Sequence, residues 1–585
     1  MKRIRWSRGA SAAEAKCFSG GRLRTGTGIL LLALLLSLMG LAGAAMPELR
    51  LCWMVEGQEV SITPVERGGK YFLFLPGPVK AKSPVVRTEP GADLIWNGQT
   101  FASGQEMPVE LLVGSENEVR FSNGRRLGQV EVMRGSSIPA LFFTVDPEEY
   151  QRINMGTKFD IRKDARLVML KGDGSLETAQ NIPSMKTHGN STFFAAKKAF
   201  QFQMEEKASL AGMRKNRKWM LLANWFDISL VRNQIAFDLC REIGLSSTPD
   251  CAQVDLYING AYNGVYLLTE KIQLKKGRLE ITDLEEILEK LNGAAAYESA
   301  PFRKGSGKGI VSLMKWFDLP VEPEDVTGGY LLEIEKALQF SQMTNGAGFV
   351  TDGGMCVVVK EPTRAGLREV QYIAGLVNDF HNAVLQKDGY SRATGKYYAD
   401  YMDMASFARK IIIEEFTGNF DVRAASQYMY KDADSVDGRL YAGPGWDYDL
   451  SFGNKDDGLR NPTKLDYVFR RSSDKSYLYH WLLTQQDFVA ETRRIFDEEF
   501  EPAAEVLLGW REPRPGSPLK TVAEYQEAIR QSAAMNFTRW SARAIPDVWD
   551  GSGRTFEDAG NFVANWAQQR LVMMTRDWLR SMPGT

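Results

Sequence analysis

The sequence predicts an α+β fold with two lobes, preceded by a small all-β sandwich domain. Short β-like segments fill the chain to about residue 136, mixed strands and helices follow to about residue 365, and mainly helical segments occupy the rest. A chain of 585 residues is also too long for one ordinary hydrophobic core. We therefore expect a β-sandwich accessory domain and a larger second domain made of an N-lobe and a helical C-lobe, with boundaries at 46–136, 137–585, about 137–365 and about 366–585.

The predicted sandwich depends on apolar runs that are separated by turn residues. Segments such as "YFLFLPG", "ADLIWNGQTF" and "NEVRFSNGRRLGQVEVMRG" have this texture. Asn97-Gly98 and Asn123-Gly124 are dipeptides typical of tight hairpins. Nothing in this region has the pattern of a catalytic site, so we expect an accessory module.

The first 45 residues are predicted to be a targeting segment outside the fold. Basic stretches are followed by the apolar run "ILLLALLLSLMGLAGA", which ends in the small residues Ala42-Gly43-Ala44. A basic start, an apolar centre and a small-residue end describe a secretory signal peptide. The run is also close to the length of a membrane span, so an uncleaved anchor is the alternative. Either reading predicts an exported protein, extracellular or at the cell surface.

Composition excludes some classes of function. Lys plus Arg (72) nearly balances Asp plus Glu (73), which gives a net charge of −1. A general nucleic-acid binder needs an excess of cations to neutralise phosphates, so we expect no nucleic-acid partner. The three histidines, far apart in the sequence, make a zinc site or a Ser-His-Asp hydrolase poorly supported; they are His188, His381 and His480.

Cysteine spacing leaves two readings open. No CxxC or CxxH pattern occurs after the N-terminal segment. Cys240 and Cys251 are a conceivable disulfide in an exported protein, and buried free thiols are the alternative.

Two elements in the mixed region are well marked. "DISLVRNQIAFDLCREIGL" predicts a helix, with Asp227 as its cap and Gly244 as its stop. The next segment, "VDLYINGAYNGVYLLTE", alternates apolar residues around an Asn- and Gly-rich turn and predicts a β-hairpin.

The stretch "KTHGNSTFFAAKKAFQFQ" is the first that could carry chemistry. Its Gly-Asn-Ser-Thr turn, with Asn190 and Ser191, could cradle a phosphate through backbone N–H groups. Lys197 and Lys198 follow, and only one of two neighbouring strand residues can face a cleft. Lys198, Phe200 and Phe202 are spaced two positions apart, so they would lie on the same face of a strand. If that face is covered, Lys198 is the lysine that faces inward. A solvated strand face is the alternative reading.

Two acidic segments further along the chain could hold a cation or orient a hydroxyl. Asp421 follows a helix end and a Gly-Asn turn in "EEFTGNFDVRAASQYMYKD", where an ordinary loop is the competing reading. Asp447 and Asp449 lie in "LYAGPGWDYDLSFGN" between bulky aromatic residues, which argues against a freely solvated loop. Two hard oxygen ligands so close together suit Mg²⁺ or Mn²⁺.

A phosphate-facing lysine, a loop acid and a metal-binding acid, in this order, follow the logic of a kinase. The chain has no G-x-G-x-x-G, H-R-D or D-F-G sequence, so it is not a standard protein kinase. The segments already quoted, together with "GGYLLEIEK" and "GWDYDLSFGN", resemble the spore coat protein H (CotH) kinase family from about residue 138 onward. The resemblance implies a divergent protein-kinase-like two-lobed fold, ATP as a partner, Mg²⁺ or Mn²⁺ as a cofactor, and phosphorylation of a protein hydroxyl of the Ser/Thr type.

The resemblance also implies roles for individual residues. Asp421 matches the catalytic-loop acid, Asp447 the metal-holding acid and Lys198 the nucleotide-contacting lysine. Asp449 is a second metal ligand, and Glu270 lies near the hinge that contacts the nucleotide. Arg232 matches, with the neighbouring Asn233, a pair that organises the cleft, and we count Arg232 among the nucleotide-binding residues.

Two departures from the family pattern bear on activity. His188 stands where the family usually has Arg, so a titratable ring replaces a fixed cation. Ser426, followed by Gln427, stands where the family often has an Asn metal ligand, and serine is the poorer match. We therefore expect an exported atypical kinase acting on an unidentified protein substrate, with a catalytically weak CotH-like surface or structural binding protein as the alternative. A Mg²⁺- or Ca²⁺-dependent hydrolase is a third reading that lacks an obvious general base beside the acids.

Overall fold

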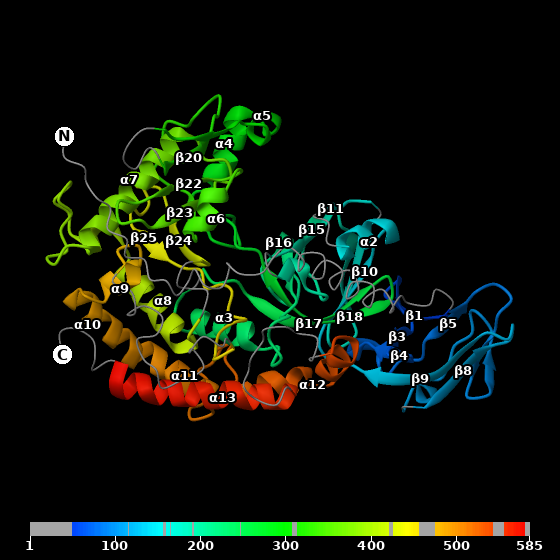
Figure 1. The fold of residues 1–585 in the computed structure, drawn as a ribbon. Coiled ribbons are helices and arrows are strands. Elements are labelled where there is room, and N and C mark those ends of the chain that lie inside the picture. The colour runs from blue at the N-terminus through cyan, green and yellow to red at the C-terminus, as the bar shows by residue number, and fades with distance from the viewer. Residues whose placement is uncertain are drawn as a thin grey trace, which may run out of the picture.

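The computed structural model of the protein describes residues 49–114, 116–155, 160–163, 165–189, 192–245, 247–306, 313–419, 425–454, 474–541 and 555–578. Strands dominate the N-terminal half of the chain, and helices dominate the C-terminal part (Figure 1). The predicted α+β class is therefore confirmed. The predicted signal peptide or anchor lies outside the described residues. No helix in the described part of the chain has both the length and the apolarity needed to cross a bilayer.

The first nine strands form two sheets of their own, here called the β-module (residues 49–134). A three-stranded sheet has the order β2-β1-β5, and a six-stranded sheet has the order β3-β4-β9-β8-β6-β7. Asn97 and Gly98 both have positive φ, 48° and 83°, and close the β6–β7 hairpin that the dipeptide predicts. The strands are β1 (Leu49–Val55), β2 (Gln58–Ile62), β3 (Val65–Arg67), β4 (Lys70–Leu75), β5 (Val85–Thr88), β6 (Leu94–Trp96), β7 (Gln99–Phe101), β8 (Asn117–Phe121) and β9 (Arg126–Arg134).

The β-module does not have a hydrophobic core of its own. Its apolar side chains share one buried cluster with Phe142, Val168 and Tyr257 of the neighbouring sheet and with Met535 near the C-terminus. Figure 1 shows the β-module (blue) at one end of the molecule, beside the sheet that contains β10, β17 and β18. The division of the chain into the domains expected from the sequence remains a prediction.

A nine-stranded sheet forms the centre of the molecule. Its order is β11-β14-β15-β16-β18-β17-β10-β12-β13, and all its pairs are antiparallel except β10 with β17. The helix α2 (Pro147–Asn154) follows β10. The strands are β10 (Ala140–Thr144), β11 (Asp160–Ile161), β12 (Arg166–Leu170), β13 (Leu176–Asn181), β14 (Ser184–His188), β15 (Ala199–Ala208), β16 (Asn216–Leu222), β17 (Cys251–Ile258) and β18 (Ala261–Glu270).

The two well-marked sequence elements occur in this region. The β17–β18 hairpin is present as predicted. The helix α3 (Arg232–Glu242) begins five residues after Asp227 and ends before Gly244, whose φ is +88°. Asp227 still serves the helix start, because its carboxylate accepts the Arg232 N–H at 2.9 Å, but it does so from a turn that precedes the helix.

A second large sheet has seven strands in the order β19-β20-β22-β23-β21-β24-β25. It lies across from the central sheet, on the other side of the cavity described below. The helices that accompany it are α4 (Leu284–Asn292), α5 (Ala294–Glu298), α6 (Ala337–Gln342) and α7 (Leu367–Val384). The strands are β19 (Phe302–Lys304), β20 (Lys315–Phe317), β21 (Tyr330–Ile334), β22 (Ala347–Val350), β23 (Cys356–Glu361), β24 (Gln427–Lys431) and β25 (Leu440–Ala442).

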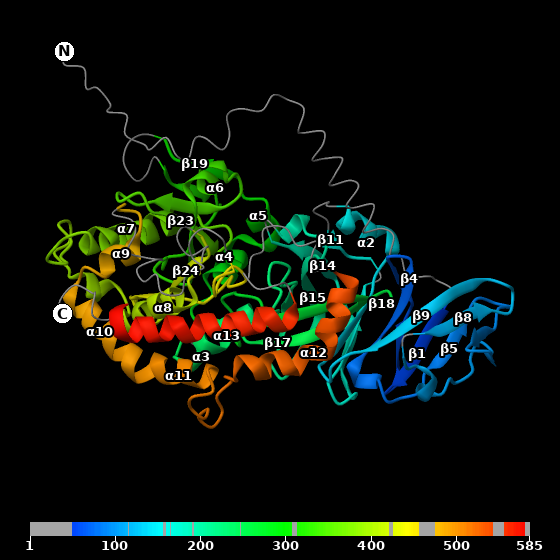
Figure 2. The same cartoon turned by 60° about the horizontal axis from the view of Figure 1, so that its bottom comes forward.

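The C-terminal helices form the base of the molecule in the view of Figure 1. Both views show α12 and α13 side by side, with α12 reaching the β-module (Figures 1 and 2). The helices are α8 (Met404–Thr417), α9 (Leu478–Leu482), α10 (Gln486–Ile495), α11 (Glu501–Leu507), α12 (Val522–Arg539) and α13 (Phe556–Met573). Large side chains from α3, α7, α8 and these helices share the largest hydrophobic cluster.

The cysteines among the described residues are all buried free thiols, namely Cys52, Cys240, Cys251 and Cys356. The conceivable Cys240–Cys251 disulfide is therefore not formed. The alternative reading of the sequence, buried free thiols, is the correct one.

Candidate functional site

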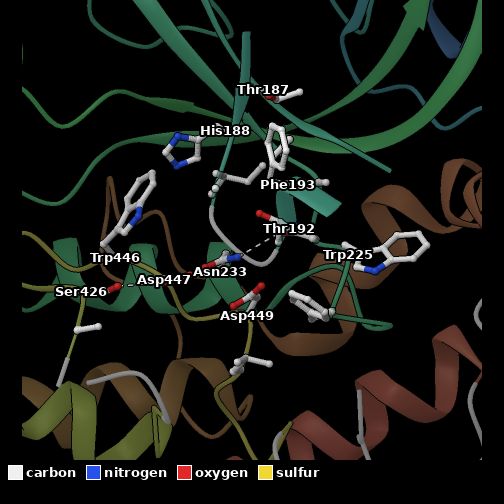
Figure 3. Close-up of a pocket in the computed structure, with 18 of the residues that line it drawn as sticks. Thr187, His188, Thr192, Phe193, Trp225, Asn233, Ser426, Trp446, Asp447 and Asp449 are labelled. Atoms are coloured by element: carbon white, nitrogen blue, oxygen red, sulfur yellow. Dashed lines mark hydrogen bonds between the residues drawn. The ribbon is translucent and has the colours of Figure 1, made fainter. Parts of the chain in front are cut away.

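A cavity of about 820 Å³ opens between the central sheet and the seven-stranded sheet. Its walls come from β14 and the turn after it, the end of β16, the start of α3, β21, β23 and the segment that follows β25. Figure 3 shows His188 entering the cavity from the sheet side and Asp447 and Asp449 entering from the opposite side. Many of the lining side chains are charged, aromatic or polar. They include Asp160, Lys186, His188, Phe193, Trp225, Phe226, Asn233, Glu333, Glu335, Lys336, Lys360, Ser426, Tyr428, Trp446, Asp447 and Asp449.

The acidic segment after β25 presents both of its aspartates to this cavity. Asp447 and Asp449 line the cavity, whereas Tyr448 between them is fully buried in the opposite direction. Asp447 has φ +68°, in the left-handed region that residues with a Cβ rarely adopt. Such conformations persist only where the surroundings hold them in place, and they gather at functional sites.

Helix α3 holds the acidic segment from one side. The Tyr448 N–H donates to Asn233 Oδ1 at 2.8 Å, and Arg232 Nε donates to the Ser451 carbonyl at 3.1 Å. Arg232 is itself fully buried and forms an ion pair with Asp227. Asn233 lines the cavity and Arg232 does not, so the organising role of the pair and the nucleotide contact of Arg232 stay predictions.

Helix α8 holds the segment from the other side. The Tyr448 hydroxyl donates to Glu414 Oε1 at 2.8 Å, and Lys410 forms an ion pair with the same carboxylate. All three side chains are fully buried. Asn419, just after the helix, donates to the Asp447 carbonyl at 3.2 Å. A buried ion pair with extra hydrogen bonds is rigid and specific, so the acidic segment has a fixed course.

Ser426 joins the acidic segment from a different part of the chain. Its Oγ donates to Asp447 Oδ2 at 3.0 Å, and its own φ of 58° is also left-handed. Ser426, just before β24, and Tyr428, within this strand, both line the cavity. Gln427 faces the other way, and its amide nitrogen and oxygen are buried without a hydrogen-bond partner in the described part of the chain.

These residues fit a small, hard cation. Two carboxylates and one hydroxyl supply oxygen atoms only, which suits Mg²⁺ or Mn²⁺ and not a soft metal. No cluster of three or more His, Cys, Asp and Glu side chains able to enclose a metal occurs over the described ranges. An incomplete protein shell is what Mg²⁺ needs when it keeps waters and also binds substrate phosphates.

Lys198 is not among the residues that line the cavity. Strand β15 begins only at Ala199, and the Lys198 Nζ turns back to donate to the Phe193 carbonyl at 2.7 Å. Lys197 is still more deeply placed: its Nζ donates to the Ala223 and Val265 carbonyls, and burial lowers its pKa to about 7. The nucleotide contact assigned to Lys198 stays a prediction.

Glu270 is likewise not among the residues that line the cavity. It ends β18 and is buried, with Arg278 and Arg214 as ion-pair partners; the Arg214 contact is 3.2 Å. This arrangement holds the connection between the central sheet and the following segment. Asp421, Asn190 and Ser191 lie outside the described residues, so their roles stay predictions as well.

The structure adds cavity residues to which the sequence assigned no role. Lys186 and Lys360 line the cavity from β14 and β23, and Glu333 on β21 pairs with Lys360 at 2.8 Å. A signal for Lys186 was present, because Lys186 and His188 are two positions apart and so share one face of a strand. No local pattern marks Lys360 or Glu333, which meet the site only through tertiary folding.

Residues 185–574, about two thirds of the chain, match the family described as CotH kinase protein. The match includes β14, α3, β24 and the acidic segment, that is, all the described walls of the cavity except Asp160. A search of curated proteins finds no match. The chain belongs to the CotH kinase family.

Proposed function

We propose that this protein is an atypical kinase that transfers the γ-phosphate of ATP to a protein hydroxyl with the help of Mg²⁺ or Mn²⁺. The observation that carries the proposal is that Asp447, Asp449 and Ser426 line the same cavity, with Ser426 hydrogen-bonded to Asp447. Family membership supports the same reaction class. We extend the proposal to the fold, taking the central sheet with α3 as one lobe and the seven-stranded sheet with the C-terminal helices as the other.

The side chains of this chain would contribute to catalysis mainly by holding charged groups in fixed positions. Asp447 and Asp449 would hold the divalent cation, which when bound neutralises charge on the ATP phosphates. The hydrogen bond that Asn233 accepts from the Tyr448 N–H and the buried Lys410–Glu414 pair would keep these carboxylates in place before ATP arrives. Such preorganised electrostatics and positioning are the main sources of rate in phosphoryl transfer.

The remaining parts of the proposal rest on the sequence. Asp421 would orient the acceptor hydroxyl and accept its proton, and Lys198, Asn190, Ser191 and Glu270 would act on the nucleotide side. Export, with cleavage or membrane attachment of the N-terminal segment, follows from its basic and apolar pattern.

A second candidate function is a CotH-like surface or structural binding protein with weak or no transfer. The contact that favours it is the Ser426–Asp447 hydrogen bond, because it engages the hydroxyl and the carboxylate with each other. A cation would have to compete with that contact for the same two oxygen atoms.

The test is incubation of the purified protein with labelled ATP and Mn²⁺, alone and with candidate acceptor proteins. The kinase proposal requires label transfer by the wild type and its loss in Asp447→Asn. Thermal melting with ATP and Mn²⁺ separates the two candidates, because a ligand that binds only the native state raises the melting temperature. A shift without label transfer favours the binding protein, and no shift at millimolar ligand excludes a nucleotide site.

A further inference from the structure

The wall of the cavity carries charged groups of both signs. Figure 3 shows Asp447 and Asp449 across the cavity from His188, and the charges of Lys186, Lys271 and Lys360 act on His188. We call the side of the two aspartates the acidic end and the side of His188 and the lysines the basic end. Lys186 and His188 on β14 and Lys360 on β23 stand elsewhere on its wall. The proposed metal site uses only the acidic end, so the function of the basic end is unassigned.

Strand register gathers further lysines on the same face of the central sheet. Ser184 of β14 pairs with Gln203 of β15, and Gln203 pairs with Lys218 of β16. Because alternate residues of a strand share a face, Lys186 and Lys218 point to the same side of the sheet. Lys271 directly follows the end of β18, whose last residue pairs with the neighbour of Lys218.

The pKa of His188 is affected by these lysine charges. Its pKa is lowered to about 4, mainly by burial and in addition by the charges of Lys271, Lys360 and Lys186. The imidazole is therefore neutral at physiological pH. The positive charge at this end of the cavity belongs to the lysines alone.

Nearby acids neutralise this charge only in part. Glu333 pairs with Lys360 at 2.8 Å, and the charges of Glu361 and Glu285 favour the protonated form of Lys271. The cross-strand neighbour of Lys186 is Asp160, which also lines the cavity, but its carboxylate is bonded to Arg162 and Ser184. Within the described ranges, no carboxylate lies within 4.0 Å of the ammonium groups of three of these lysines: Lys186, Lys218 and Lys271.

We propose that the lysine-rich end of the cavity binds a multiply charged oxyanion of the phosphate class. Like charges that converge on a partly enclosed surface are costly unless an anion offsets them. The two aspartates would repel the same anion, so it belongs at the lysine end. The anion is carried either by the nucleotide, as its own phosphates, or by a second molecule. The inference rests on the proposed function only for this choice of phosphate chemistry.

The first experiment is calorimetric titration of the full chain with pyrophosphate in the absence of divalent metal. Lys186 is exposed, so Lys186→Gln should fold normally and weaken binding by at least about fivefold, the loss of one charge-assisted hydrogen bond. Lys186→Arg and the distant exposed control Lys387→Gln should remain within about twofold of the wild type. Absence of pyrophosphate binding to the wild type, or equal weakening by both glutamine variants, overturns the proposal.

A second experiment identifies the source of the anion. The titration is repeated with saturating ATP and Mn²⁺ present. If ATP displaces pyrophosphate, the lysines hold the phosphates of the nucleotide; if pyrophosphate still binds, they hold a phosphate group of another molecule. Both results support an anion site at the lysines.

Asp447→Asn separates this inference from the proposed kinase activity. Metal-free pyrophosphate binding should be unchanged or tighter in this variant, because one repelling carboxylate is gone. Label transfer from ATP can fail in the same variant without any effect on the lysine site. Weaker metal-free pyrophosphate binding in Asp447→Asn would place the anion at the acidic segment and overturn the inference.

Discussion

Ser426 and Asp447 hold each other through a 3.0 Å hydrogen bond, and both have left-handed backbone conformations, with φ of 58° and 68°. Each of these conformations costs a residue with a Cβ about 1–2 kcal/mol. Asn tolerates the left-handed region better than most residues, which gives substitutions at these positions a predictable order.

Asp447→Asn should retain the fold and lose the response to metal. The amide keeps the shape and tolerates φ +68°, whereas the charge that would hold the cation is removed. Without metal, the melting temperature should equal or slightly exceed that of the wild type, because Asp449 no longer faces a like charge. Thermal melting with and without Mn²⁺ and ATP measures both effects.

Asp447→Ala provides the matched comparison. It removes the same charge but also the side chain that tolerates the left-handed region, so it should unfold more easily than Asp447→Asn by about 1 kcal/mol. If Asp447→Asn kept the full Mn²⁺ response, the assignment of Asp447 as a metal ligand would be wrong.

Ser426→Asn should strengthen metal binding. Asn suits φ 58° and offers an amide oxygen that reaches further than the serine hydroxyl. We expect the Mn²⁺ concentration for half-maximal label transfer to fall about three- to tenfold, a gain of roughly 1 kcal/mol. Ser426→Gly is the control, since it removes the hydroxyl at no backbone cost and should raise that concentration. Equal values for the two variants would show that position 426 does not contact the metal.

His188→Gln should reduce the loss of stability in acid. The folded pKa of His188 is about 4, below the ordinary 6.5, so the unfolded chain takes up a proton more readily than the native protein. The stability that His188 contributes is therefore complete above pH 6.5 and is lost as the pH falls toward 4. We expect the free energy of unfolding to fall by about 2 kcal/mol less in the variant than in the wild type over this interval, after allowance for water in the cavity. Urea titrations at several pH values test the difference, and parallel curves for the two proteins would contradict it.

Ser532→Ala should loosen the attachment of α12 to β17 and to the segment that follows the β-module. The Ser136 N–H donates to Ser532 Oγ at 2.9 Å, and that hydroxyl donates to the buried Asp255 carboxylate at 2.7 Å. Its removal leaves a buried N–H and a carboxylate oxygen each short of one partner, which costs about 2–3 kcal/mol. Chemical denaturation measures the loss. Gln531→Ala, at an exposed position next on α12, should change stability by no more than about 0.5 kcal/mol.

The sequence was most informative where the structure is local. The β17–β18 hairpin and α3 follow from alternation and helical spacing, and the crowding of two aspartates among aromatic residues correctly indicated a partly enclosed acidic segment. The start of α3, five residues after the predicted cap, also has a local cause. The Asp227 carboxylate accepts hydrogen bonds from the Ser229 and Arg232 N–H groups in the turn before the helix.

The sequence was least informative where distant segments meet. Strand parity assigned Lys198 to the cavity, but parity applies only within a strand, and β15 begins one residue later. The cavity lysines Lys186 and Lys360 come from different sheets. The contact of α12 with the segment after the β-module joins positions about 400 residues apart, for which no periodic pattern exists. The segment 284–325, which lacks a clear pattern, nevertheless contains α4, α5, β19 and β20.

Tyr448→Phe tests whether the buried network beneath the acidic segment controls metal binding. The substitution keeps the ring and removes the hydroxyl that donates to Glu414 at 2.8 Å, close to the Lys410 ion pair. We expect a loss of about 1–3 kcal/mol in the free energy of unfolding, because a buried carboxylate loses a hydrogen bond. We also expect a smaller rise in melting temperature with Mn²⁺ and ATP, because Asp447 and Asp449 flank Tyr448 and become less fixed.

Tyr398→Phe is the matched control for this prediction. The Tyr398 ring is fully buried and its hydroxyl donates to Asp487 at 2.6 Å, but neither residue lines the cavity. Its removal should also lower stability, though by less, because water can reach the exposed Asp487, and it should leave the rise in melting temperature with Mn²⁺ and ATP unchanged. If the two variants lost the response to ligand equally, that loss would reflect general destabilisation. If only Tyr448→Phe lost it, the buried Lys410–Glu414 pair would act on the metal through Tyr448, because both substitutions delete a hydroxyl from a fully buried ring and only Tyr448 lies beneath the acidic segment.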